Sequence, residues 1–289
     1  MNILLDEYFN LKVGSFLILI FHSTDIHIRR MKQKKPLILV TNDDGITSPG
    51  ITALVDVACE FGDVCVIAPD KPQSGMGHAI TVHSGIMVIP QQFKGTKAAF
   101  SCTGTPADCV KLGKYHLLKE KPDLCLSGIN HGANMSLNVI YSGTMSAALE
   151  GALEGIPSIG ISLCNNHTGQ SLDASKKVVK ILLETFLINK PDNNLCLNVN
   201  VPDIPFHEIK GLRFCRQGKG NWKEHYDEHK NENGEEFLWL TGKFENFEKR
   251  KTDTDLWALD NNYVSVVPIH ADMTHYEELE KVKKWEVQW

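Results

Sequence analysis

The sequence lacks the excess of basic side chains that marks proteins which bind nucleic-acid backbones. Its 289 residues carry 30 Lys and Arg against 35 Asp and Glu, for a net charge of −5. A surface without a positive field is a poor partner for a polyanion, so no nucleic-acid polymer is expected. The net charge does not exclude small anionic ligands, because these need only a local positive potential.

The sequence also lacks a hydrophobic run long enough to cross a membrane. The apolar stretch of residues 13–21 is too short, since a spanning helix needs about 20 such residues. A secretory signal is not expected either, because Asp6 and Glu7 precede that stretch and polar residues follow it. We therefore predict no membrane partner, and we interpret residues 1–34 as a disordered N-terminal extension.

Metal-binding and disulfide patterns are absent among the eight cysteines, which show no C-x-x-C pair. Most of them fall inside apolar segments, which is typical of buried, reduced thiols. This usage predicts a cytoplasmic protein.

Two common nucleotide-binding fingerprints are missing as well. A P-loop would need a lysine after its second glycine, but Gly45 and Gly50 are followed by Ile51 and Thr52. A dinucleotide fingerprint fails because Gly75 and Gly77 are followed by Ile80 where the third glycine belongs. A kinase or ATPase of the P-loop type is therefore disfavoured.

The most informative stretch that is present spans residues 36–45. Four apolar residues follow Pro36 and end in a polar cluster with Asp43, Asp44 and Gly45, which predicts a buried strand with polar groups at its carboxyl end. Two adjacent carboxylates repel each other unless a cation or a shared proton offsets the repulsion. The pair suggests a hard metal ion; the alternative is that one carboxylate caps the next helix and the other is solvated.

Strands and helices alternate along most of the chain. This order predicts an α/β fold with a doubly wound, mostly parallel, Rossmann-like sheet. Residues 79–90 alternate about Ser84 and Gly85 and predict a hairpin that projects from the sheet. The predicted strands are 37–40, 64–68, 98–102, 123–127, 156–163 and 195–201, and the predicted helices are 47–60, 105–118, 144–154 and 172–188.

The character of the sequence changes near residue 211. We predict a catalytic core over residues 35–210 and a C-terminal appendage over residues 211–289 that has too little core of its own. The appendage contains predicted strands at 237–244 and 263–269 and a terminal helix at 276–285. It is interpreted as an oligomerisation arm, and residues 217–236, with His225 and His229, as a charged loop.

Three loops leave the carboxyl ends of predicted parallel strands, and each carries oxygen ligands. They contribute Asp43 and Asp44, then Ser74, and then Asn130 and Asn134. A set of carboxylate, hydroxyl and amide oxygens suits Mg²⁺, Mn²⁺ or Ca²⁺ better than zinc.

A candidate anion site follows at the start of the predicted helix 144–154. Ser142, Gly143 and Thr144 stand there, where free N–H groups and the helix dipole favour an anion, although an ordinary Ser or Thr cap is the simpler alternative. Together with the oxygen ligands, this start points to a phosphate ester. The loop histidines His78, His83 and His131 are candidates for acid or base chemistry or, more simply, solvated residues.

Five motifs in this order resemble the SurE family of survival-protein nucleotidases. A later segment, YVSVVP at 263–268, is similar to the family's C-terminal strand. The motifs are LVTNDDG at 39–45, APDKPQSG at 68–75, TGTPADCV at 103–110, SGINHGAN at 127–134 and YSGT at 141–144.

This resemblance implies a metal-dependent phosphohydrolase that acts on nucleoside 5′- and 3′-monophosphates and, in some members, on short polyphosphate. It implies one divalent cation, Mg²⁺ or Mn²⁺, per subunit and a homodimer or homotetramer built through an exchanged C-terminal arm. Asp43 and Asp44 would be catalytic. The implied metal ligands are Asp43, Asp44, Ser74 and Asn130, and the implied phosphate-binding residues are Asn134, Ser142, Gly143 and Thr144.

The sequence departs from the family pattern at one residue, and it also allows one alternative function. Asn138 stands where many members have an aspartate. The alternative function is a non-catalytic, metal-assisted nucleotide-binding module whose working unit is the oligomer.

Overall fold

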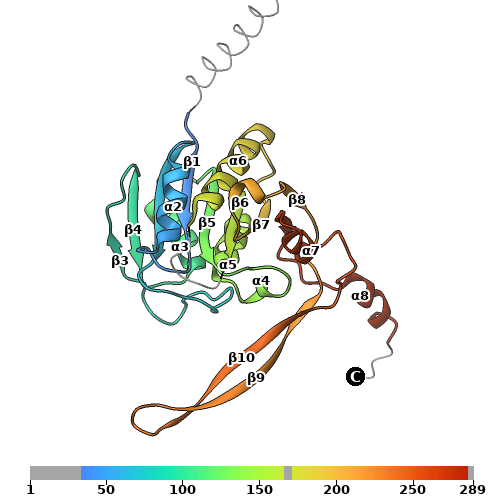
Figure 1. Cartoon of the computed structure of the whole chain (residues 1–289). Coiled ribbons are helices and arrows are strands. Elements are labelled where there is room, and N and C mark those ends of the chain that lie inside the picture. The colour runs from blue at the N-terminus through green and yellow to red at the C-terminus, as the bar shows by residue number, and fades with distance from the viewer. Residues whose placement is uncertain (1–33, 166–170, 286–289) are drawn as a thin grey trace, which may run out of the picture. The chain divides into compact units, whose positions relative to one another are not determined.

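A nine-stranded sheet organises the part of the chain that the computed structural model describes, residues 34–165 and 171–285. The prediction for the N-terminal extension lies almost wholly outside these residues. Most neighbouring strands are parallel, and only the pairs β3/β4 and β7/β11 are antiparallel. The strand order is β3 (Val88–Pro90), β4 (Ala98–Cys102), β2 (Asp63–Pro69), β1 (Leu37–Thr41), β5 (Leu124–His131), β6 (Ser158–Cys164), β7 (Cys196–Pro202), β11 (Val264–Ile269) and β8 (Leu212–Phe214) (Figure 1).

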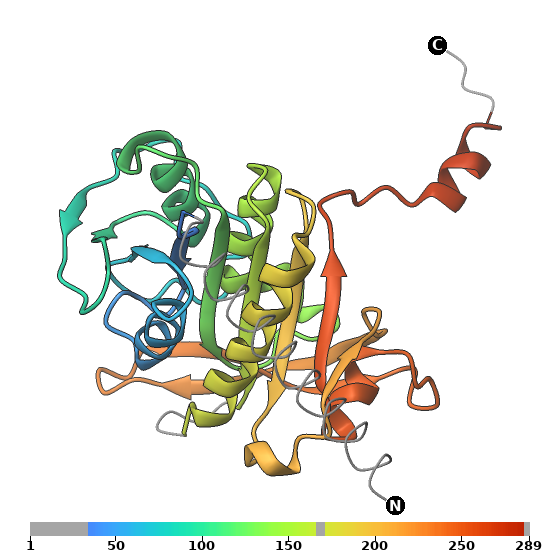
Figure 2. The same ribbon diagram turned by 90° about the horizontal axis from the view of Figure 1, so that it is seen from above.

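Helices cover both faces of the sheet, which confirms the predicted α/β fold (Figure 2). Helices α2 (Pro49–Ala58) and α6 (Asp173–Asn189) pack on the face to which Ile38 and Val40 contribute. Helices α3 (Pro106–Leu112) and α5 (Gly143–Leu153) pack on the face of Leu39. Successive residues of β1 thus enter different cores, as the two-residue period of a strand requires.

The strand order reverses at β1, which lies between β2 and β5. The chain moves outward from β1 through β2 and β4, returns to β5 on the other side, and continues through β6 and β7. Ligands of open α/β sheets bind beyond the carboxyl ends of the strands at such a reversal. The loops after β1 and β5 are therefore the first place to look for a site.

Local sequence explains where the helices of the core begin. Ser48 caps α2 by accepting the N–H of Ile51, and Pro49 occupies the first turn, where its missing N–H carries no penalty. Thr105 and Asp108 form a reciprocal capping box at α3. Helix α3 continues into a π-helical turn, Gly113–Leu117, so that the predicted helix 105–118 consists of two parts.

The projecting hairpin is in a different place from the predicted one. Residues 79–87 contain no strand, and only the short β3 follows them, so the hairpin predicted at 79–90 is wrong. The long hairpin consists instead of β9 (Gly220–Lys230) and β10 (Glu236–Asn246), which pair over their full length. The expectation of a charged loop at 217–236 is therefore also wrong. The sequence did not reveal this ribbon because a ribbon that is exposed on both faces needs no alternation of apolar and polar residues.

The C-terminal residues contribute to the main sheet as well as to the hairpin. Strand β11 pairs with β7, and β8 pairs with β11 at the edge. Two short α-helices belong to this part, α7 (Asp255–Asp260) and α8 (Tyr276–Val282), and α8 extends away from the sheet (Figure 2). The boundary at 210/211 stays a prediction. Within the described ranges, no helix is both long and apolar enough to span a bilayer.

Candidate functional site

The loop after β1 is held in a tight turn by Asn42. The buried amide of Asn42 donates to the Gly45 carbonyl at 2.9 Å and to the Ser48 hydroxyl at 2.8 Å. Gly45 has a φ of 91°, a conformation that favours glycine. The turn and the start of α2 are thereby fixed together, and Asp43 and Asp44 lie on this rigid support.

Asp43 is the point at which three elements meet. Its side chain is buried, with 4% exposed, and its carbonyl accepts the N–H of Gln73 at 2.7 Å. The Thr144 hydroxyl donates to its carboxylate at 2.5 Å. Gly143 packs so closely that an added Cβ would lie 2.6 Å from the Cβ of Asp43. The loop after β2 and the start of α5 therefore both contact the predicted metal ligand.

The two carboxylates are held in an environment that disfavours their charge. Burial raises the pKa of Asp43 to about 6, the hydrogen bond from Thr144 acts against that rise, and the charge of Asp44 adds to it. Burial also raises the pKa of Asp44, against the influence of His131. One oxygen of Asp44, Oδ2, is buried without a hydrogen-bond partner. A cation would satisfy that oxygen and favour both charges.

The loop after β2 contains Ser74 and contacts the backbone of Asp43 through the neighbouring residue Gln73. Ser74 is exposed and follows Gln73, the residue whose N–H contacts the Asp43 carbonyl. The far end of the loop is held by Gly77, which donates to the Tyr141 carbonyl at 3.2 Å, and by His78, whose Nε2 lies 2.8 Å from Glu150 Oε2. His78 thus has a structural contact, while His83 is exposed.

A bulge in β5 sets the direction of the third group of ligands. The register between β5 and β6 shifts between Ser127 and Asn130, and bulges commonly re-aim side chains beside active sites. Asn130 is 9% exposed and donates its amide N–H to the Gly132 carbonyl at 2.9 Å. The amide oxygen is therefore the atom of Asn130 that suits a cation. His131 follows, and its buried Nδ1 has no partner.

Asn134 lies at the end of this loop in a buried polar network. Its amide nitrogen donates to Ser162 at 2.8 Å, and its backbone N–H donates to the side chain of Asn200 at 2.7 Å. Asn198 donates to its carbonyl at 2.7 Å. One of the two amide hydrogens of Asn134 is thus committed to the sheet, and the other is the one that suits a phosphate.

The start of α5 is at once a helix cap and a carboxylate contact. Ser142 accepts the N–H of Met145 at 3.0 Å, the ordinary cap that the sequence left open. The hydroxyl of Thr144 donates to Asp43, and the backbone N–H of Thr144 also acts to lower the pKa of that carboxyl. The positive end of this helix therefore stabilises Asp43. Gly143, with no side chain, leaves its backbone close to the same carboxylate.

Sequence reasoning missed Glu150, Asn198, Asn200 and Asp255, all buried polar residues that contact the site loops. For the two asparagines a signal exists. They occupy alternate positions in the apolar strand β7, near the edge where ligands bind. A polar pair on one face of a buried strand indicates a specific partner there. Glu150 and Asp255 carry no comparable local signal.

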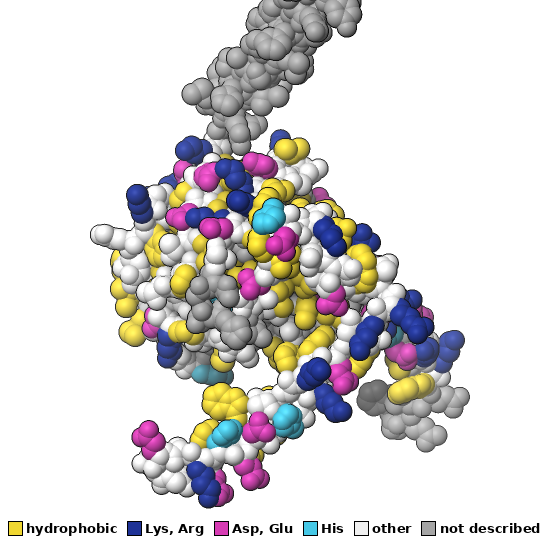
Figure 3. Space-filling view, viewed as in Figure 1, with side chains coloured by type: hydrophobic (Ala, Val, Ile, Leu, Met, Phe, Trp, Pro, Cys, Tyr) yellow, Lys and Arg dark blue, Asp and Glu magenta, His cyan; other side chains and the backbone are white. Residues whose placement is uncertain are grey.

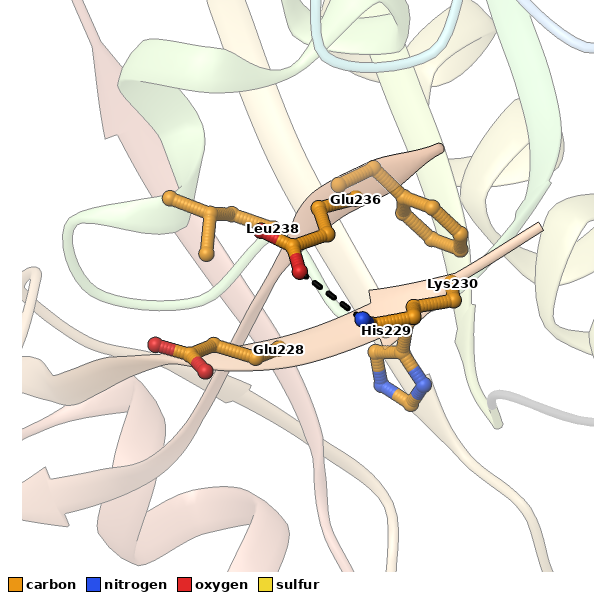
Figure 4. Close-up of a pocket in the computed structure, with 6 residues that line it drawn as sticks. Glu228, His229, Lys230, Glu236 and Leu238 are labelled. Carbon is orange, nitrogen blue, oxygen red and sulfur yellow. Dashed lines mark ion pairs between the residues drawn. The ribbon is translucent and has the colours of Figure 1, made fainter. Parts of the chain in front are cut away.

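A hollow of about 460 Å³ lies elsewhere, on the β9–β10 hairpin. Its lining comes from residues 228–230 and 236–238, and an ion pair between Lys230 and Glu236, at 2.9 Å, crosses it (Figure 4). None of the predicted site residues lines it. It is open to solvent on an exposed ribbon, and we give it no part in the chemistry.

These observations define an α/β protein with two adjacent carboxylates, one buried and one half-buried, at the reversal point of its sheet. The family model for survival protein SurE matches residues 38–224. The chain belongs to the SurE family.

Relatives match over most of their length. The 5′-nucleotidase SurE of Christiangramia forsetii is 50% identical over 259 residues, which cover 88% of this chain and 98% of the relative. The protein of the same name from Flavobacterium johnsoniae is also 50% identical, with coverages of 89% and 99%. The crystal structure of the SurE protein from Aquifex aeolicus has a TM-score of 0.73 and 38% identity, and it covers 86% of this chain and 98% of its own.

Proposed function

We propose that this protein is a divalent-metal-dependent 5′-nucleotidase, which releases phosphate from nucleoside monophosphates. The observation that carries the proposal is the adjacent pair of the buried Asp43 and the half-buried Asp44, with the unpartnered Oδ2 of Asp44, at the reversal point of the sheet. The names of the relatives, 5′-nucleotidase SurE, support the substrate class. Activity on 3′-monophosphates and on short polyphosphate belongs to the same proposal.

Asp43, Asp44, Ser74 and Asn130 would hold one Mg²⁺ or Mn²⁺ per subunit. The donors are all oxygens, and two are carboxylates whose charge the protein alone leaves incompletely offset, so the set fits a hard cation. When bound, such an ion lowers the pKa of a coordinated water and offsets charge on phosphoryl oxygens.

The protein's own groups supply orientation. The contacts from Thr144 and from the N–H of Gln73 hold Asp43 rigidly, so its carboxylate is suited to orient the attacking water. The phosphate-binding groups are the free amide hydrogen of Asn134 and the start of α5 at Ser142, Gly143 and Thr144. Attack in line with the leaving oxygen needs no covalent phospho-enzyme.

We further propose a cytoplasmic homodimer or homotetramer. The described residues include all eight cysteines, each as a free thiol, which suits a reducing compartment. The hairpin and α8 expose large apolar side chains, among them Trp239 at 61% and Tyr276 at 62%. Figure 3 shows hydrophobic, charged and histidine side chains interspersed along the hairpin. Covering such apolar groups is a common reason for subunits to associate.

The decisive experiment measures phosphate release from a panel of nucleoside monophosphates with Mg²⁺ or Mn²⁺, with a chelator, and with Asp44→Ala. We expect activity that the chelator abolishes and that Asp44→Ala lowers by about a thousandfold or more. The matched control is Asp63→Ala, because Asp63 is exposed at the opposite end of β2. Full activity in chelator or in Asp44→Ala would end the proposal. Nucleotide binding without phosphate release would favour the non-catalytic module.

A further inference from the structure

Asp255 is a buried carboxylate outside the predicted site. It is the first residue of α7 and is 0% exposed. Its two oxygens accept three backbone N–H groups, from Ser136 at 2.8 Å, Gly218 at 2.7 Å and Leu256 at 2.8 Å. None of the ion pairs found in the described ranges includes it. A buried charge that is held only by N–H groups is costly, so its contacts carry a specific role.

Two of the three N–H groups come from segments that are distant from Asp255 in sequence. Ser136 lies in the loop after β5, Gly218 lies just before β9, and Leu256 belongs to α7 itself. Ser136 also donates its hydroxyl to the Gly218 carbonyl at 2.8 Å. The carboxylate and this hydroxyl together join the loop after β5 to the base of the hairpin.

The backbone at this junction leaves little freedom. Ser136 is fully buried and has a φ of 51°, in the left-handed region that residues with a side chain rarely adopt. Such a conformation costs of the order of 1 kcal/mol and persists only where surrounding contacts hold it. At Gly218, an added Cβ would lie 2.9 Å from the Asp255 carboxylate, so only glycine fits.

The loop that Asp255 holds is the one that presents Asn134. Residues 133–138 are fixed on the inner side by the network of Ser162, Asn198 and Asn200 around Asn134. On the outer side they are fixed by Asp255 at Ser136 and by Asn138. Asn138 donates to the Ala133 carbonyl at 3.1 Å and accepts the indole N–H of Trp222 at 2.8 Å.

We propose that Asp255 is a positioning residue of the phosphate subsite. It acts through Ser136 to hold the loop in the conformation that directs Asn134 toward the substrate phosphate. The inference rests on the proposed nucleotidase function and extends it to a residue 121 positions away, since 255 − 134 = 121. The carboxylate is needed because an amide has one acceptor oxygen in place of two.

The test compares Asp255→Asn and Ser136→Gly with the control Asp253→Asn. Ser136→Gly relieves the left-handed strain but removes the hydroxyl that the Gly218 carbonyl accepts, so it loosens the loop from the base of the hairpin while keeping the N–H that Asp255 accepts. Asp253 is an exposed partner of Arg216 two residues from Asp255. The measurements are the inhibition constant of inorganic phosphate in the nucleotidase assay and the dissociation constant of Mn²⁺ by calorimetry.

We expect phosphate inhibition to weaken about tenfold in Asp255→Asn and severalfold in Ser136→Gly. The dissociation constant of Mn²⁺ should stay within about threefold of the wild-type value in both variants, because no metal ligand lies in residues 133–138. The control Asp253→Asn should match the wild type in both measurements. An unchanged phosphate constant in Ser136→Gly, or an equal loss of Mn²⁺ affinity, would overturn the inference. Should Asp255→Asn not fold, Ser136→Gly decides alone. A wild-type protein without phosphate release would instead refute the proposed function.

Discussion

The loop edge of the sheet and the β9–β10 hairpin use polar residues in opposite ways. At the edge, buried polar side chains bond across elements that are far apart in sequence, such as Thr144 to Asp43. Along the hairpin, side-chain contacts such as that of Thr241 with His225 stay largely within the ribbon and are exposed. The contact of Trp222 with Asn138 joins the two regions at the base. The edge is therefore preorganised for a small ligand, whereas the exposed hairpin suits the subunit contact that we propose.

The largest expected effect is that of Asp43→Asn, which should lower activity and raise stability. Asp43→Asn should lower nucleotidase activity by about a thousandfold or more, because a metal ligand and its charge are lost. The folded pKa of about 6 lies above the unfolded value of about 3.9, so ionisation destabilises the metal-free fold as pH rises through this window. The variant should therefore be more stable at pH 8 without metal, by about 3 kcal/mol at most.

Denaturant unfolding at pH 4 and pH 8 in chelator measures this difference. At pH 4 the wild type and Asp43→Asn should have similar stability, since Asp43 is largely protonated when folded. The hairpin control is Asp227→Asn, which should change the free energy of unfolding by less than about 0.5 kcal/mol at either pH. A variant that is less stable than the wild type at pH 8 would contradict the prediction.

The second prediction concerns the hairpin as a partner surface. Replacing its exposed Leu238 and Trp239 by serine should shift the oligomer toward monomers, because the area that drives association is removed. Light scattering after gel filtration measures the mass over a range of protein concentrations. The monomer should keep its thermal unfolding temperature, since these residues lie outside the hydrophobic core clusters. An unchanged mass distribution would assign the interface to other residues.

A third, smaller effect is expected at Glu150, which holds the Ser74 loop through His78. Glu150 contacts His78 at 2.8 Å and Lys111 at 2.6 Å, and its side chain is 5% exposed. Glu150→Gln should lower kcat/KM about tenfold and stability by about 2 kcal/mol, because a charged partner of two groups is removed. Steady-state kinetics with the Mn²⁺ dependence of KM would test it. If kcat/KM stays constant while stability falls, Glu150 supports the fold alone.

The smallest effect is expected in the dependence of stability on pH under acidic conditions. Contacts with Lys114, Tyr115 and Lys111 lower the pKa of Glu154 to about 2, although burial acts the other way. The folded value lies below the unfolded value of about 4.3, so this stabilisation is present above that pH and is lost as pH falls toward 2. The free energy of unfolding of Glu154→Gln should therefore fall less steeply than that of the wild type over that pH range. Glu236→Gln, in the exposed pair with Lys230, should change the free energy of unfolding by less than about 0.5 kcal/mol.

Prediction from sequence succeeded where the signal is local. The strand predicted at 37–40 and the helix starts predicted near Ser48 and Thr105 follow from residues that are neighbours in the chain. It failed at the hairpin, because β9 has no buried face and therefore no alternating pattern. The ligand loops could be located from the alternation of strands and helices, since carboxyl ends of parallel strands share one edge.

The sequence by itself determined the fold class and the family motifs, because both depend on short runs of residues in a set order. Only the tertiary structure decided that Thr144 bonds to Asp43 and that Asp255 holds Ser136, residues separated by 101 and 119 positions. Such contacts form after the chain has folded back on itself. No local propensity records them, because a carboxylate on its own does not specify which distant N–H group it accepts.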